Sequence, residues 1–111
     1  MKKLTLAIIT AALALTVSTV SAADAKTNYE KHCAGCHGKT GKGDTKLGQK
    51  WECRDFTDPK VQEKLKDEEM FKAIKEGLKK GDRTLMKPYF PEKLNEQEIK
   101  DLVAYIRKFK K

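Results

Sequence analysis

The feature that most constrains this chain is the run Cys33-Ala34-Gly35-Cys36-His37. Cys-x-x-Cys-His is the pattern at which a c-type haem is attached. Two thiols three positions apart lie about one helical turn from each other, so both can reach the two vinyl groups on one edge of a porphyrin. The imidazole that follows can then bind the iron as the proximal ligand. The motif therefore predicts one haem c, covalently held through Cys33 and Cys36.

The same cysteines allow three other interpretations: a redox dithiol, a zinc half-site and a structural disulfide. A thioredoxin-like dithiol expects a βαβ unit, and no alternating strand pattern surrounds residues 33–37. A zinc site needs about four Cys or His ligands. His32 and Cys53 are the remaining candidates, and they form no second paired cluster. We therefore favour haem attachment.

The N-terminus has the pattern of a secretory signal peptide. Lys2 and Lys3 precede an apolar stretch over residues 4–17, and small residues follow. Cleavage after Ala22 or Ala23 satisfies the small-x-small rule. The alternative is an uncleaved membrane anchor, but the stretch contains threonines and is short of the roughly 20 apolar residues that span a bilayer. We expect an exported, periplasmic protein with no stable membrane insertion.

A signal peptide over residues 1–23 leaves one small domain over residues 24–111, which is 88 of the 111 residues. With Lys2 and Lys3 taken from the 24 basic residues, 22 remain against 16 acidic ones, a formal charge of +6. The lysines are interleaved with acids, aromatics are few, and no nucleic-acid motif is present, so we expect no nucleic-acid binding. The charge favours acidic protein partners. We expect a monomer.

Hydrophobic periodicity and capping residues predict four helical segments and no strand. The first spans about residues 25–32 and continues into the cysteine motif. A polar, glycine-rich loop over residues 38–48 follows; it has no phosphate-loop pattern. A short second helix is expected to begin with Asp58 as its N-cap and Pro59 at the first helical position.

The third predicted helix has Asp67 as its N-cap and ends at Gly81. Its buried face is expected to carry Phe71, Ile74 and Leu78 at positions i, i+3 and i+7.

The last helix has the clearest signature. Asn95 and Glu98 form a pair close to the usual capping box. The apolar residues that follow trace the i, i+3, i+4, i+7 spacing of one helix face: Ile99, Leu102, Val103 and Ile106. The domain is therefore predicted to be all-α.

With His37 as one axial ligand, the other axial position of the iron is either open or filled by a second side chain. His32 adjoins Cys33 on the proximal side and cannot easily reach the opposite face of a haem. Met70 lies within the third predicted helix, where a role in the core explains it. Met86 lies in a stretch after the helix that is interrupted by prolines, and such a stiff, irregular segment can present a thioether. We predict Met86 as the ligand.

Cys-Ala-Gly-Cys-His-Gly, the Met-Lys-Pro-Tyr segment and the closing Leu-Val-Ala-Tyr-Ile-Arg helix together resemble a small monohaem class I c-type cytochrome. The resemblance covers nearly the whole predicted domain. It implies an all-α fold of about four helices around one covalently bound haem c. It also implies that Cys33 and Cys36 are the thioether anchors, that His37 is the proximal ligand, and that Met86 is the distal ligand.

The resemblance further implies that the first and last helices cross, with Ala25 and Tyr29 near Tyr105. Two features depart from it. Members of this class often carry a proline in the loop after the motif, whose carbonyl bonds the proximal imidazole, and residues 45–48 contain none. The hydrogen-bond partner of His37 is therefore unassigned. Cys53 is a third thiol, which can be either a small apolar residue of the core or a disulfide-forming or reactive group.

His/Met ligation raises the reduction potential, because the soft thioether favours ferrous iron. A six-coordinate iron has no vacant position for a substrate. We therefore expect an electron carrier that shuttles one electron between acidic redox proteins, and not an enzyme. Lys39, Lys42 and Lys87 are expected near the exposed haem edge. The alternatives are a five-coordinate haem catalyst or gas sensor, in which Met86 is no ligand, and a haem-bearing redox subunit of a larger enzyme.

Overall fold

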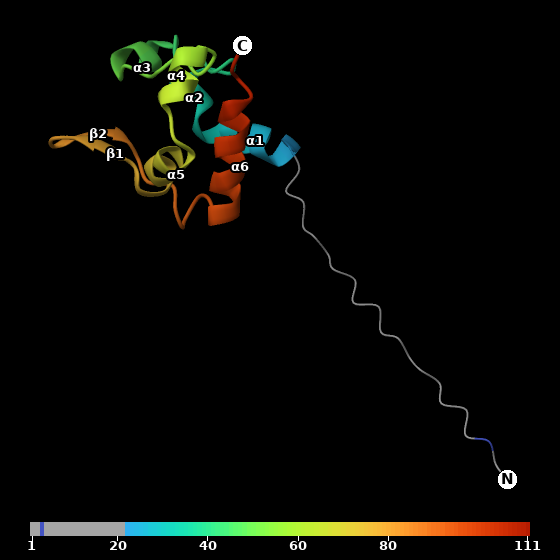
Figure 1. Ribbon diagram of the computed structural model, residues 1–111. Helices are drawn as coiled ribbons and strands as arrows, with labels where there is room; N and C mark the ends of the chain where they lie inside the picture. Colours follow the sequence, from blue (N-terminus) through green and yellow to red (C-terminus); the bar gives the residue numbers. More distant parts are fainter. Residues whose placement is uncertain (1–2, 4–21) are drawn as a thin grey trace.

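The computed structural model describes residue 3 and residues 22–111, so the predicted signal peptide lies almost wholly outside the described residues. Figure 1 shows helices gathered around α6, with a β-hairpin that projects to one side. No helix in the described part of the chain is long and apolar enough to cross a membrane. The elements follow in the order α1 (Ala22–His32), α2 (Ala34–His37), α3 (Lys46–Lys50), α4 (Pro59–Lys64), α5 (Asp67–Glu76), β1 (Leu78–Lys80), β2 (Arg83–Met86) and α6 (Glu96–Arg107).

The first and last helices pack against each other, as predicted. Ala25 and Tyr29 on α1, and Cys33 directly after it, are buried, and a spacing of four residues places them on one face. The ring of Tyr29 lies 5.2 Å from that of Tyr105 and 5.0 Å from that of Phe109, between ring centres. This aromatic cluster packs α1 against the C-terminal end of the chain.

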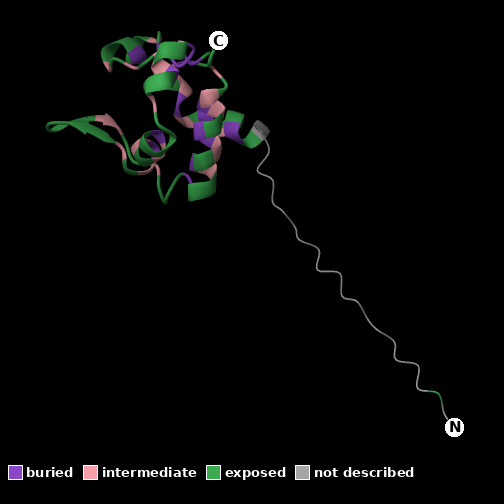
Figure 2. Cartoon of the chain, in the orientation of Figure 1, coloured by how far each residue is buried: buried purple, intermediate pink, exposed green. Residues whose placement is uncertain are grey.

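The predicted capping box of α6 is confirmed. The Asn95 side chain accepts a hydrogen bond from the backbone N–H of Glu98 at 2.8 Å, and the Glu98 carboxylate accepts one from the N–H of Asn95 at 3.1 Å. The predicted apolar face of this helix is buried throughout. α5 packs against α6 and contributes Met70 and Ile74 to the core. Figure 2 shows the buried residues where these helices meet, whereas the hairpin is largely exposed.

The shorter elements agree with the sequence in part. α4 begins as predicted, with Asp58 as an N-cap that accepts from the N–H of Lys60 at 2.9 Å. The glycine-rich stretch 38–48 is not a loop throughout, because α3 begins at Lys46. Its N-cap is Thr45, whose hydroxyl accepts from the N–H of Gly48 at 2.9 Å. The described residues therefore form six helices, two more than the four expected.

The prediction that the domain contains no strand is wrong. β1 and β2 form an antiparallel pair in which Leu78 faces Met86. α5 does not continue to Gly81, because the chain leaves the helix at Gly77. The φ of Gly77 is +82°, a conformation that glycine adopts with little strain because it has no Cβ. Gly81 forms the turn of the hairpin, and Leu78, which was assigned to the buried face of the helix, is 47% exposed.

Arg107, at the end of α6, forms hydrogen bonds with residues of α4, of α5 and of the segment between them. Its guanidinium donates to the carbonyl (2.6 Å) and the side-chain oxygen (3.0 Å) of Gln62, to the carbonyl of Leu65, and to Asp67 at 2.8 Å. Asp67 is the first residue of α5, and Lys66 rather than Asp67 is the N-cap. The buried Gln62 in turn donates to the carbonyl of Phe56 at 2.7 Å. The network therefore links α6 to α4, to the start of α5 and to Phe56.

Candidate haem-binding site

The cysteine motif forms one tight helical turn at the end of α1. The backbone N–H of Cys33 donates to the carbonyl of Tyr29 at 2.8 Å, which completes the last turn of α1. The carbonyl of Cys33 accepts from the N–H of His37 at 2.9 Å, which closes the turn of α2. Cys33 is buried, Cys36 is half-buried, and both thiols are free. The fold thus brings Cys33, Cys36 and His37 together in the arrangement expected from their spacing.

The environment of Cys33 differs from that of a redox dithiol. Burial, and then the charge of Cys36, raise the pKa of Cys33 to about 12. This thiol is therefore protonated at neutral pH. Reactive cysteines in Cys-x-x-Cys motifs have a lowered pKa, because the thiolate is the nucleophile. Cys33 therefore lacks the lowered pKa that the dithiol interpretation requires.

The His37 ring is held between apolar and backbone groups. It stacks on Phe56, with ring centres 4.9 Å apart and planes 21° from parallel. Burial lowers the pKa of His37, so the ring is neutral at neutral pH, the form that binds iron. Its Nδ1 is buried without a hydrogen-bond partner among the described residues, which agrees with the missing proline carbonyl. The next residue, Gly38, is fixed by the hydroxyl of Tyr29, which donates to its carbonyl at 2.7 Å.

A second layer of backbone packs onto the motif from α3. The Thr45 hydroxyl lies 3.0 Å from the carbonyl oxygen of Gly35 and 2.8 Å from that of Cys36. Gly48 allows α3 to approach this closely, because a Cβ built there would collide with the carbonyl oxygens of Gly43 and Cys36. The α3 segment thereby fixes the turn that carries the two thiols.

Met86 comes from a different part of the fold. It is the last residue of β2, so the prediction of an irregular segment at this position is wrong. It is half-buried and packs against the hydrophobic core, which includes Cys33. Gly77 lies directly against it, since a Cβ built on Gly77 would be 2.5 Å from the Met86 carbonyl oxygen. The competing methionine, Met70, is buried in α5, as expected of a core residue.

Cys53 is a free, half-buried thiol close to the motif. Burial, and then the charge of Cys36, raise its pKa. Within the described ranges, no group of three or more His, Cys, Asp or Glu side chains is arranged to hold a metal ion. The described residues therefore offer no zinc site of the usual kind.

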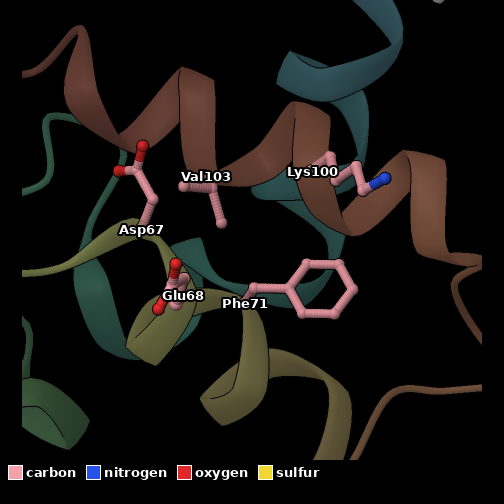
Figure 3. A pocket seen from close by; sticks show the side chains of 5 residues that line it. All are labelled: Asp67, Glu68, Phe71, Lys100 and Val103. Carbon is pink, nitrogen blue, oxygen red and sulfur yellow. The ribbon is translucent and has the colours of Figure 1, made fainter.

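A groove of about 420 Å³ lies between α5 and α6 (Figure 3). Phe71 and Val103 provide apolar surface there. The rim is charged, with Lys100 from α6 and acidic side chains from the start of α5. None of the predicted haem ligands lines this groove, so it is separate from the candidate site.

Thr45, Gly48 and Phe56 also shape the site, and their contributions were not predicted from the sequence. Thr45 precedes a helical stretch and could have been recognised as an N-cap. Gly48 and Phe56 offered no local signal for the site, because Gly48 meets Cys36, twelve positions earlier, and Phe56 stacks on His37, nineteen positions earlier.

The residues present fit a covalently bound haem. Two free thiols lie on one turn, the adjacent imidazole is neutral, and a half-buried thioether reaches the same core from the hairpin. The iron of a c-type haem takes one or two protein ligands beside the porphyrin nitrogens, so this donor set is sufficient.

The family to which the chain belongs follows from comparison. The Cytochrome c sequence model matches residues 22–110. The chain is therefore a member of the Cytochrome c family, small monohaem proteins that hold haem c covalently and transfer electrons. The mostly helical structure agrees with the class I fold of this family.

Solved structures of Kustc0563 are similar to the chain. The structure titled KustC0563 c-type cytochrome is 39% identical, with a TM-score of 0.69, and the match covers 79% of this chain and 99% of that one. The structure of a tyrosine-to-phenylalanine mutant of Kustc0563 is 36% identical, with a TM-score of 0.66 and coverage of 78% and 99%. No curated protein matches the chain.

Proposed function

We propose that this chain is a periplasmic one-electron carrier whose haem c is bound through Cys33 and Cys36, with His37 and Met86 as axial ligands. One observation carries the proposal: Met86 enters from the hairpin and packs against the core that contains Cys33. Haem c, when bound, supplies a one-electron couple. His/Met ligation would leave no position for a substrate, which favours a carrier over a catalyst.

The protein's own residues set the conditions for that couple. Burial keeps His37 neutral and able to bind iron. The stacked Phe56 and the turn closed by Cys33 limit the rotation of the imidazole. The hairpin fixes the backbone of Met86 through its pairing with Leu78. A ligand set held in place before electron transfer needs little rearrangement when the iron changes charge.

The exposed cations of the hairpin support acidic redox partners. Lys79, Lys80 and Arg83 are exposed, and neither ion pair among the described residues involves them. Arg83 also lies over the ring of Trp51, at 4.7 Å from its centre, and Lys50 lies 5.2 Å from the same centre. We call Lys50, Lys79, Lys80 and Arg83 the basic hairpin surface. The expected Lys39, Lys42 and Lys87 are exposed as well.

The optical spectrum of the purified mature protein tests the ligand set. We expect c-type bands on reduction and a weak far-red sulfur-to-iron band in the oxidised protein. Met86→Leu should lose the far-red band and bind carbon monoxide when reduced, because one axial position becomes free. The control Met70→Leu, at the buried core methionine of α5, should keep the band.

The mass of the same sample gives the number of attached haems and the position of signal-peptide cleavage. If the band survives in Met86→Leu, another residue is the ligand. If the wild-type protein lacks the band and binds carbon monoxide rapidly, the five-coordinate catalyst or sensor replaces the carrier.

A further inference from the structure

Tyr89 links the Met86 segment to the haem-attachment helix. It lies three residues after Met86, and its hydroxyl donates a hydrogen bond to the carbonyl of His32 at 3.0 Å. Its ring also meets the His32 ring edge to face, with centres 5.4 Å apart and planes at 62°. His32 is the residue immediately before Cys33. One side chain therefore contacts α1 next to the first haem anchor.

The backbone of Tyr89 is anchored to other elements. Its N–H donates to the carbonyl of Ile74 in α5 at 3.1 Å, and its carbonyl accepts from the N–H groups of Lys93 and Leu94, both at 3.0 Å. The residue is half-buried and packs against the hydrophobic core. Tyr89 thus connects α5, through its backbone, with α1, through its side chain.

Two backbone contacts of Met86 lie on the α5 side. Met86 pairs with Leu78 in the hairpin, and its carbonyl packs against Gly77. Both partners directly follow α5. They fix Met86 relative to α5, whereas the hydroxyl of Tyr89 fixes the same segment relative to the helix that carries the thiols and leads to His37.

We infer that Tyr89 is a positioning residue, which holds the Met86 segment against α1 and so determines how firmly the Met86 thioether keeps its axial position. The inference rests on the proposed ligation by Met86. Loss of the hydroxyl removes one hydrogen bond across the site, and the methionine segment then leaves the iron more readily. An external ligand that competes with Met86 reports this directly.

Imidazole binding to the oxidised holoprotein is the test. In Tyr89→Phe, the ring and its packing are kept and the hydrogen bond is lost. We expect imidazole to bind roughly 2- to 10-fold more tightly than to the wild type, as the net contribution of one hydrogen bond requires. The matched control is Tyr105→Phe, which removes a tyrosine hydroxyl from α6 in the aromatic cluster with Tyr29. A second variant, His32→Ala, removes the ring contact but keeps the accepting carbonyl, and should change imidazole affinity less than Tyr89→Phe.

The possible results separate this inference from the proposed function. If all variants show the far-red band and Tyr89→Phe binds imidazole like the wild type and Tyr105→Phe, the positioning role is overturned and ligation by Met86 stands. If the wild-type protein lacks the band, Met86 is no ligand and both proposals are overturned. A loss of stability to denaturant in Tyr89→Phe without a change in imidazole affinity indicates a merely structural residue, and also overturns the inference.

Discussion

At the scale of single residues, Gly77 shows two constraints in one position. Its φ of +82° is a conformation that residues with a Cβ adopt only with strain. A side chain there would also press on the carbonyl of Met86. Gly81, four residues further on, has a φ of +62°, but a Cβ built on it would have nothing within 4 Å. A substitution at Gly81 would therefore introduce backbone strain alone, whereas one at Gly77 would introduce both strain and a steric clash.

We expect Gly77→Ala to lower the free energy of unfolding by about 1–3 kcal/mol, from strain and crowding together. The holoprotein variant should also show a weaker far-red band, because the carbonyl of Met86 must shift. The control Gly81→Ala should lose less stability and keep the band. Denaturant unfolding and the oxidised spectrum measure both effects. Equal losses in the two variants would contradict a specific contact between Gly77 and Met86.

At the scale of elements, the N-terminal cap of α6 also contacts α1. Glu98, the second member of the capping box, also accepts a hydrogen bond from the side chain of Asn28 on α1 at 3.0 Å. The cap therefore stabilises both α6 and its contact with the haem-motif helix. Such coupling could not be predicted from the sequence, where Asn28 and Glu98 are 70 positions apart.

We expect Asn95→Ala to lower the free energy of unfolding by about 1 kcal/mol, the usual cost of losing an N-cap. Asn95→Ser keeps a side-chain oxygen that can accept from the N–H of Glu98, and should remain close to the wild type. Thermal or denaturant unfolding of the holoproteins measures the difference. A Ser variant as unstable as the Ala variant would show that the cap contributes little here.

The α5–hairpin boundary shows why periodicity alone misplaced an element. Phe71, Ile74 and Leu78 fit a helical face, which favours a helix that extends to Gly81. The chain instead leaves the helix at the first glycine, Gly77, and Leu78 pairs with Met86 across a strand. The strands are short and mostly exposed, and they carry no alternating apolar pattern that a sequence could reveal.

At the scale of the whole molecule, the hairpin is a projection that carries exposed basic side chains. The hairpin projects from the helices (Figure 1) and exposes Lys79, Lys80 and Arg83 without ion pairs among the described residues. Arg83 connects this projection to Trp51 at the end of α3. A partner that meets the hairpin would therefore approach the molecule beside the segment that carries Met86.

Electron transfer with small charged reagents, which requires no known protein partner, tests whether the basic hairpin surface attracts anionic reactants. Oxidation of the reduced holoprotein by ferricyanide should slow several-fold as salt is added, because screening weakens attraction between opposite charges. Lys79→Glu combined with Lys80→Glu should lower the rate at low salt, whereas Lys108→Glu combined with Lys110→Glu, at the exposed C-terminus, should lower it less. With a cationic cobalt oxidant, the rate should instead rise as salt is added, because screening weakens the repulsion between like charges. Equal effects of the two double variants would show that only net charge matters.

The features that depend on local spacing could be predicted from the amino-acid order alone. These are the haem motif on one helical turn, the N-cap at Asp58, the capping box of α6 and the apolar face behind it. Each involves residues within a few positions of one another, where helix geometry decides which groups meet. The Cytochrome c family match agrees with that interpretation.

The remaining features arise from contacts between distant segments, which form only once the chain has folded. Phe56 lies on the His37 ring, Tyr89 bonds the carbonyl of His32, and Gly77 packs against Met86. None of these contacts has a periodic signature. They depend on how α1, α5 and the hairpin meet, which a pattern of neighbouring residues does not encode.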